Sequence, residues 1–120
     1  MNKTILLVDD EPVTAGAIKE MLKKHGYESI IACSGLEAVE FAHTKENINL
    51  VLMDIELGGG IDGAETARRI LAERPVPIVF MTSHPETDYF DRIKDIPRYG
   101  FAIKNSGNFV LISSIEMAYE

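Results

Sequence analysis

Cysteine is almost absent from this sequence. The single one, Cys33, excludes an internal disulfide framework and fits a reducing compartment. The three histidines, His25, His43 and His84, show no metal-ligand spacing with Cys33. A zinc-type centre built from Cys and His is therefore not expected.

Long apolar runs and positive charge are also scarce. No segment approaches the ~20 apolar residues that cross a bilayer, and the start MNKTILLVDD lacks the apolar length and the cleavage site of a signal peptide. The chain has 12 Lys and Arg against 19 Asp and Glu, a formal charge of −7, and no basic patch. We therefore expect a cytoplasmic chain with no membrane insertion and no direct nucleic-acid binding.

The sequence does contain enough apolar residues for a core, 46% of 120. They gather in short runs that are rich in Ile, Val, Leu and Phe, as is typical of strands buried on both faces: 4–9, 29–33, 48–54, 77–82 and 100–104. Because amphipathic segments separate the runs, we expect a parallel sheet with helices on both faces. This pattern predicts one α/β domain, a flavodoxin-like (βα)5 three-layer sandwich with a parallel five-stranded sheet in the order 2-1-3-4-5.

The segments between the runs carry signals of helix boundaries. Pro12 suits a first helical turn and Gly26 suits a C-terminal cap, while Ser34 and Asp62 stand where N-caps are expected. The first helix is expected to have an apolar face made of Val13, Ala17, Ile18, Met21, Leu22 and His25. These signals support a helix after each of the first three strands.

Polar side chains stand where the predicted strands end. Asp9 and Asp10 follow the first strand, and Asp54 ends the third. Thr82 and Lys104 end the fourth and fifth strands. In the order 2-1-3-4-5 the first and third strands are neighbours where the winding reverses, and ligands bind there beyond the carboxyl ends. We therefore expect three carboxylates to converge in one crevice, with a hydroxyl and an amine on the same rim.

Adjacent carboxylates need a compensating charge, because two charges ~4 Å apart at an effective dielectric of ~20 repel by about 4 kcal/mol. A carboxylate cluster without nearby His or Cys favours a hard cation such as Mg²⁺. With Mg²⁺ on one side and Lys104 facing it across a gap, a phosphoryl group would be neutralised from two sides, which phosphoryl transfer mainly requires. Asp54 is the best-placed nucleophile, centrally at the end of the most apolar strand.

The motifs VDDEP, LVLMDIEL…DG, VFMTS and GFAIK, in this order over essentially the whole chain, together resemble the receiver (CheY-like) domain of two-component response regulators. The resemblance implies one receiver domain over residues 1–120, which takes a phosphoryl group from a sensor histidine kinase or a phosphotransfer protein. Such a domain is not an enzyme beyond assisting its own phosphorylation and dephosphorylation. The segments IELGGGIDG and KNSG resemble receivers attached to sensor or hybrid kinases, so the chain is either a stand-alone regulator or part of a longer protein.

The resemblance also implies roles for the polar residues at the strand ends. Asp54 resembles the phosphoacceptor. Asp9 and Asp10 resemble the acidic pair that holds Mg²⁺ together with Asp54, with Asp10 a direct ligand, and the backbone carbonyl of Glu56 would be a further ligand. Lys104 resembles the lysine that contacts a phosphoryl oxygen.

A second group of residues resembles the family's switch. Thr82 resembles the hydroxyl that moves toward the phosphoryl group, and Phe101 resembles the aromatic residue that then turns inward. The face made by the fourth helix, the fifth strand and the fifth helix would change its partners or form a homodimer. In this family the positions of Glu56 and His84 tune the lifetime of the phosphate, and we expect these two residues to pair across the phosphoryl site and shield it from water.

The sequence departs from the family pattern in two places. Lys104 is followed by Asn105, where the family usually has proline after a cis bond, so we expect either a trans bond with a shifted loop or a strained cis bond. The loop from Asp54 to Gly63 is one residue longer than the common pattern, and it should be flexible because of Gly58, Gly59 and Gly60.

Three other functions compete with the phosphorylated switch. A degenerate receiver that acts as a phosphorylation-independent interaction module is favoured by the missing proline but not by the complete acidic set and Lys104. An Mg²⁺-dependent aspartyl-phosphate hydrolase usually has Asp-x-Asp after its first strand, whereas Asp9 and Asp10 are adjacent. A flavodoxin is disfavoured because DDEPVT would repel a flavin phosphate.

Overall fold

The computed structural model describes residues 3–83, 89–104 and 107–120, with residues 89 and 90 described by their backbone alone. Its sheet has five parallel strands in the order β2-β1-β3-β4-β5, as the sequence predicts. The strands are β1 (Thr4–Val8), β2 (Glu28–Ala32), β3 (Leu50–Asp54), β4 (Ile78–Thr82) and β5 (Gly100–Ile103). The first and third strands are therefore neighbours at the centre of the sheet.

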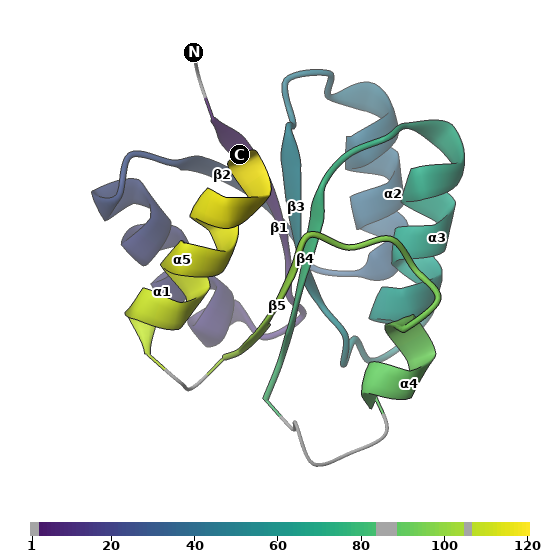
Figure 1. The fold of residues 1–120 in the computed structure, drawn as a ribbon. Coiled ribbons are helices and arrows are strands. Elements are labelled where there is room, and N and C mark those ends of the chain that lie inside the picture. Colours follow the sequence, from purple (N-terminus) through teal and green to yellow (C-terminus); the bar gives the residue numbers. More distant parts are fainter. Residues whose placement is uncertain (1–2, 84–88, 105–106) are drawn as a thin grey trace.

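Helices cover both faces of this sheet and make it the middle of three layers (Figure 1). They are α1 (Pro12–Lys24), α2 (Gly35–Thr44), α3 (Gly63–Glu73), α4 (Tyr89–Ile93) and α5 (Asn108–Tyr119). Helices α1 and α5 lie on one face, and α2, α3 and α4 lie on the other (Figure 1). None of the helices described is long and apolar enough to cross a membrane, and the longest, α1, has 13 residues.

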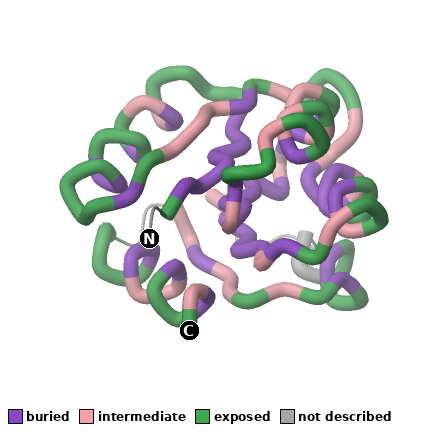
Figure 2. Tube along the Cα trace, turned by 90° about the horizontal axis from the view of Figure 1, so that it is seen from above, coloured by how far each residue is buried: buried purple, intermediate pink, exposed green. Residues whose placement is uncertain are grey.

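The hydrophobic core has two parts, one on each face of the sheet. Strands β1, β3 and β4 are buried along their whole length, which is why their sequences are apolar at successive positions. Figure 2 shows buried stretches of the chain in the middle of the molecule and exposed ones around it. In β1, Ile5 and Leu7 pack toward α1 and α5, whereas Leu6 and Val8 pack toward α2 and α3. This alternation also decides to which face each polar residue at a strand end belongs.

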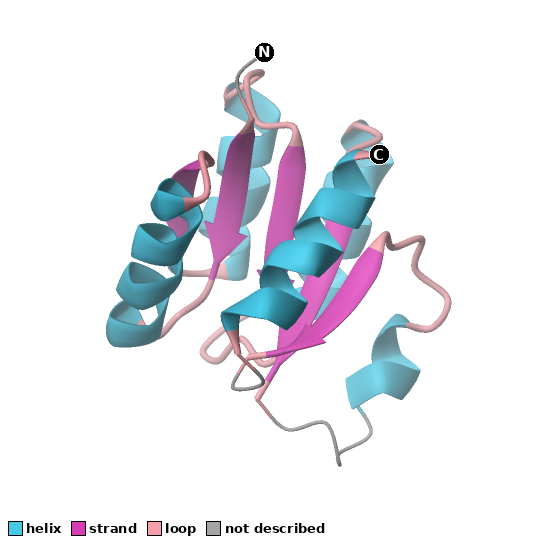
Figure 3. Cartoon of the chain, turned by 60° about the vertical axis from the view of Figure 1, so that its left-hand side comes forward, coloured by secondary structure: helices cyan, strands magenta, loops and turns pink. Residues whose placement is uncertain are grey.

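The predicted N-caps are confirmed. Oγ of Ser34 accepts a hydrogen bond from the backbone N–H of Glu37 at 3.1 Å, and Oδ1 of Asp62 accepts one from the backbone N–H of Glu65 at 2.8 Å. Gly26, just after α1, has a φ of 87°, a left-handed conformation that glycine adopts at little cost. These residues fix the ends of the helices next to the strands they connect (Figure 3).

The predicted apolar face of α1 is partly wrong. Val13 is 87% exposed, and Ala17 and His25 are exposed as well. The residues of α1 that reach the core are Ala15, Ile18, Met21 and Leu22. Two apolar stripes overlap in this helix, and the stripe at the i, i+3, i+7 spacing from Ala15 is the one that packs on the sheet.

Candidate functional site

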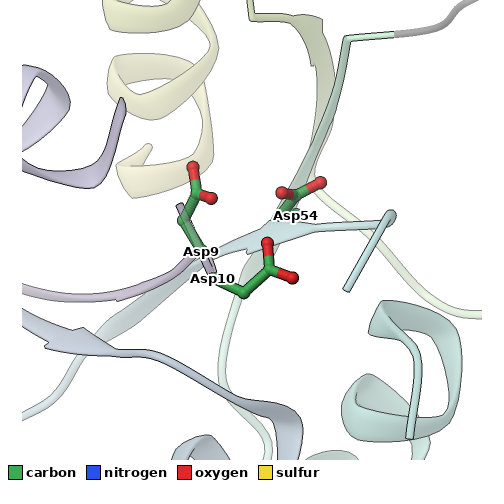
Figure 4. A group of neighbouring side chains, drawn as sticks. All are labelled: Asp9, Asp10 and Asp54. Atoms are coloured by element: carbon green, nitrogen blue, oxygen red, sulfur yellow. The ribbon is translucent and has the colours of Figure 1, made fainter. Parts of the chain in front are cut away.

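Three carboxylates lie together beyond the carboxyl ends of β1 and β3, as predicted. One oxygen of each of Asp9, Asp10 and Asp54 lies within 4.8 Å of the others. Figure 4 shows Asp9 and Asp10 on the segment after β1 and Asp54 at the end of β3, with all three carboxylates around a common space. Asp9 and Asp54 are buried, whereas Asp10 is exposed.

The period of two along each strand explains which charged groups meet. Leu7, Leu52 and Ala102 belong to the core between the sheet and α1–α5. Two residues further along each chain segment stand Asp9, Asp54 and Lys104. Because side chains two apart in a strand share a face, these three groups extend toward the α1–α5 side of the sheet edge. The topology then brings together residues that are far apart in the sequence.

Backbone N–H groups hold the carboxylates in place. Each carboxylate accepts one such bond: Asp9 from Glu11 at 3.0 Å, Asp54 from Glu56 at 2.9 Å and Asp10 from Gly58 at 2.9 Å. The last of these ties the segment after β1 to the glycine-rich loop after β3. Gly59 in that loop has a φ of 68°, which a glycine adopts easily.

Lys104 contacts the carboxylates directly, which corrects the prediction of a gap wide enough for a phosphate. Its Nζ lies 2.9 Å from Oδ2 of Asp9 and 3.2 Å from Oδ2 of Asp54, and its side chain is only 4% exposed. An ammonium buried beside two carboxylates pairs with them because an unpaired buried charge is costly. In this conformation Lys104 supplies the compensating charge that the sequence analysis assigned to Mg²⁺.

Burial changes the acidity of this cluster. The pKa of Asp54 is raised to about 6, mainly because the carboxyl is buried and in smaller part because of the charge of Asp9, although the hydrogen bond from Glu56 and the charge of Lys104 act in the opposite direction. Burial lowers the pKa of Lys104, but its contacts with Asp9 and Asp54 outweigh burial and raise that pKa overall. Lys104 is therefore an ammonium at neutral pH, and Asp54 is mostly ionised.

The donor set fits a hard divalent cation. The carboxylates of Asp10 and Asp54 border a cavity of about 250 Å³, which Glu11, Glu56, Ser83 and Lys104 also line, and the buried Asp9 carboxylate lies beside them. Mg²⁺ binds through one or two carboxylates and keeps several waters, and a half-open oxygen-rich cavity allows this. The carboxylates for the predicted site are thus assembled; the roles of Asp10 and of the Glu56 carbonyl as ligands stay predictions.

The side chain of Glu56 makes a contact that the sequence analysis did not find. Its Oε1 accepts hydrogen bonds from Oγ1 of Thr82 at 2.5 Å and from the backbone N–H of Ser83 at 2.7 Å. Glu56 was expected to pair with His84, which lies outside the described residues. The signal that could have revealed the contact is register: Asp54 pairs with Met81, so the residues just after β3 stand beside those that end β4.

Phe101 lies in β5 opposite Phe80 and is half-buried against the core on the α2–α4 side. Because Phe80 and Thr82 are two residues apart in β4, Thr82 and Phe101 lie on the same face of the sheet. The expected coupling between Thr82 and Phe101 requires this shared face, but the movement of Phe101 stays a prediction. The bond between Lys104 and Asn105 lies outside the described residues.

Gly63 holds the first turn of α3 against the backbone of the central strand. A Cβ added there would lie 2.2 Å from the carbonyl oxygen of Asp54 and 2.7 Å from Cα of Ile55. The backbone N–H of Gly63 also donates to the carbonyl oxygen of Ile55 at 3.2 Å. A residue with a side chain would displace the segment that carries Asp54, so glycine is required by close approach.

Known proteins of the same fold share this architecture. The N-terminal domain of a response regulator/sensory box/GGDEF 3-domain protein from Carboxydothermus hydrogenoformans superposes with a TM-score of 0.90 at 40% identity, over 97% of this chain and 93% of that one. Sporulation initiation phosphotransferase F of Bacillus subtilis is 33% identical over 97 residues, which are 80% of this chain and 77% of the relative.

Another relative is longer than this chain. The transcriptional regulatory protein PdtaR of Mycobacterium tuberculosis is 32% identical over 117 residues, and the chain spans 56% of its length. The response regulator receiver domain family matches residues 5–116, which include β2 to β5, all of β1 except Thr4, and most of α5. Strand order, acidic cluster and family match agree, and the chain belongs to the response regulator receiver domain family.

Proposed function

We propose that this two-component receiver domain accepts a phosphoryl group on Asp54 from a sensor histidine kinase or a phosphotransfer protein. The observation that carries the proposal is the grouping of the Asp54 carboxylate with two further carboxylates and an ammonium at one sheet edge. A carboxylate is a suitable nucleophile for a phosphoryl group, and Asp54 is mostly ionised at pH 7 because its pKa is about 6.

In the transfer step, an oxygen of Asp54 forms a bond to phosphorus while the bond from phosphorus to the donor's imidazole nitrogen breaks. The electron pair of that bond stays on the imidazole nitrogen, the imidazole takes up a proton from solvent, and an acyl phosphate is formed on Asp54. Lys104 exchanges its contacts with Asp9 and Asp54 for one with a phosphoryl oxygen. The protein's contribution is to position the reacting groups and to neutralise charge.

Receiver domains bind Mg²⁺ at an acidic cluster, and Asp9, Asp10, Asp54 and the backbone carbonyl of Glu56 are the groups that would hold it here. When bound, Mg²⁺ would neutralise charge on the phosphoryl oxygens. The hydrogen bonds to the three carboxylates keep these oxygens oriented before the ion arrives. The domain would assist its own phosphorylation and dephosphorylation and have no other enzymatic activity.

The proposed signal follows from the same site. Thr82 turns its hydroxyl to the phosphoryl group, Phe101 moves further into the core beside it, and the surface formed by α4, β5 and α5 changes. That surface is then used by a partner protein or by a second copy of the chain in a homodimer. The shared face of Thr82 and Phe101 supports this coupling.

The proposal is tested by incubating the chain with acetyl phosphate and Mg²⁺ and measuring its intact mass. We expect the addition of one phosphoryl group, its loss when Mg²⁺ is chelated, and no addition in Asp54→Asn. Glu46→Gln, which changes an exposed acidic residue away from the cluster, is the matched control and should be labelled as the wild type is. Unlabelled wild-type protein would instead support a phosphorylation-independent interaction module, and turnover of a free phosphomonoester would support a hydrolase.

A further inference from the structure

The end of β4 is held by the carboxylate of a residue from the neighbouring strand's loop. Oε1 of Glu56 accepts hydrogen bonds from the hydroxyl of Thr82 and from the backbone N–H of Ser83. The backbone N–H of Glu56 donates to Oδ1 of Asp54 at 2.9 Å. One residue is therefore bonded both to the candidate phosphoacceptor and to the hydroxyl that the proposed function requires to move.

The hydroxyl of Thr82 can donate only one hydrogen bond, so its contact with Glu56 excludes donation to another acceptor. A threonine hydroxyl has one proton, and a carboxylate can only accept, so the proton of Thr82 is committed to Glu56 in this conformation. The backbone of Thr82 is also fixed, because its carbonyl oxygen accepts a hydrogen bond from the N–H of Lys104 at 2.8 Å. The hydroxyl can then donate to another acceptor only by rotation about the Cα–Cβ bond or the Cβ–Oγ1 bond, and either rotation breaks the bond to Glu56.

We propose that Glu56 is a positioning residue that restrains Thr82 in the unphosphorylated domain, and that phosphorylation requires the hydroxyl to leave the Glu56 carboxylate for a phosphoryl oxygen. This inference rests on the proposed function. It adds that the Glu56 carboxylate competes with the phosphoryl group for the hydroxyl of Thr82. The strength of the Glu56–Thr82 bond then sets how far the unphosphorylated domain is held in its resting state. Movement of the Asp54 carboxylate would also displace Glu56, because the backbone N–H of Glu56 donates to Oδ1 of Asp54.

Glu56→Gln weakens the restraint without removing the side chain. A neutral amide oxygen is a poorer acceptor than a carboxylate, and hydrogen bonds to ionised groups are roughly twice as strong as neutral ones. We therefore expect beryllofluoride, a phosphoryl analogue, to bind Glu56→Gln about tenfold more tightly than wild type in the presence of Mg²⁺, a difference equivalent to about 1.4 kcal/mol. The affinity is measured by titration followed by amide NMR spectra.

Loss of a negative charge near the site would also favour an anionic ligand, so this effect must be separated from the restraint. Glu11→Gln is the matched control, because Glu11 borders the same cavity but its carboxylate accepts from Thr14. A double-mutant cycle with Thr82→Ala gives the second separation. In the Thr82→Ala background the effect of Glu56→Gln should fall to that of Glu11→Gln, because no hydroxyl is left to restrain.

The Ser83 amide gives a readout that does not depend on affinity. Its proton is bonded to the Glu56 carboxylate, so its resonance should lie downfield in the free wild-type protein and move upfield when beryllofluoride binds. In free Glu56→Gln it should already lie near the bound position. The resonance in Glu11→Gln should match that of the wild type.

These measurements distinguish failure of the proposed function from failure of the restraint by Glu56. If wild-type protein shows no Mg²⁺-dependent binding of beryllofluoride, the proposed function is wrong and this inference with it. If wild type binds but Glu56→Gln binds equally or more weakly, only the inference is wrong. An affinity gain that persists in the Thr82→Ala background would likewise overturn the restraint, because it would be an effect of charge alone.

Discussion

The ammonium of Lys104 lies 3.2 Å from Oδ2 of Asp54, and both side chains are almost fully buried. The ammonium therefore lies next to the carboxylate oxygen to which the proposed phosphoryl group would be attached. In the resting domain this contact neutralises the candidate nucleophile, and in the phosphorylated domain the same charge would neutralise a phosphoryl oxygen. Besides its proposed contact with a phosphoryl group, Lys104 is thus a counter-ion with which an incoming cation would have to compete.

Removing this counter-ion should destabilise the metal-free protein. Lys104→Met leaves Asp9 and Asp54 buried beside each other without a positive partner, and breaking a buried ion pair in this way costs about 3 kcal/mol or more. The free energy of unfolding is measured in urea with Mg²⁺ chelated. Lys94→Met is the control, since Lys94 is exposed and makes only a 3.9 Å contact with Asp91. Equal stability of Lys104→Met and wild type would contradict the ion pair.

The same variant should change the binding of two ligands in opposite directions. Without the competing ammonium, Mg²⁺ should bind Lys104→Met more tightly, by about tenfold or more given Coulomb energies of a few kcal/mol at this separation. Beryllofluoride should bind more weakly, because the charge that contacts it is gone. Both affinities can be obtained by calorimetric titration. A parallel change in the two affinities would show that Lys104 acts only on the fold.

The raised pKa of Asp54 predicts a specific pH dependence of stability without Mg²⁺. A folded-state pKa of about 6 against an ordinary value of 3.8 means that the protonated form is favoured in the folded protein. This contribution is complete below pH ~4 and is lost as the pH rises through ~6, a change of about 3 kcal/mol at most. Asp54→Asn should therefore become more stable than wild type above pH 6.

The measurement is the difference in the free energy of unfolding between wild type and Asp54→Asn, taken from urea titrations between pH 4 and 8. Using the difference removes the titration of groups that both proteins share. Mg²⁺ at neutral pH should stabilise the wild type and have a smaller effect on Asp54→Asn. A difference that does not vary with pH would mean that Asp54 is less buried in solution than in this structure.

Gly63 should not tolerate even one added methyl group. In Gly63→Ala the Cβ would meet the backbone at Asp54 and Ile55, neither of which can move without shifting β3, and overpacking of this kind costs about 3 kcal/mol. Gly60→Ala is the matched control, because no atom lies within 4 Å of its Cβ position and it should change stability by less than about 0.5 kcal/mol. Urea denaturation of both variants checks this. Comparable stability of the two would contradict the close approach.

The sequence predicted the fold and the acidic cluster because both follow from simple periodicities. Buried parallel strands read as continuous apolar runs, and the strand order places the ends of β1 and β3 side by side. Given that order, the period of two is enough to bring Asp9, Asp54 and Lys104 to one face. The caps at Ser34 and Asp62 were predictable for a similar reason, since they depend only on local spacing.

The contacts that the sequence did not predict depend on competition between alternatives. From the sequence, Lys104 could either face the carboxylates across a gap or pair with them, and only the structure shows that it contacts Asp9 and Asp54. The register places Glu56 beside the end of β4, but Glu56 follows the last residue of β3, and the register does not determine that its carboxylate binds Thr82. The packed face of α1 was mistaken because two overlapping apolar stripes satisfied the same helical period.

A crystal structure of the chain with Mg²⁺ and beryllofluoride would test the phosphoacceptor site at atomic level. We predict a beryllofluoride adduct on Asp54, Mg²⁺ bound by oxygens of Asp10 and Asp54, and Nζ of Lys104 moved from Asp9 to a fluoride. An adduct on another residue, or a Lys104 that keeps its contact with Asp9 while the ion binds elsewhere, would contradict the proposed site.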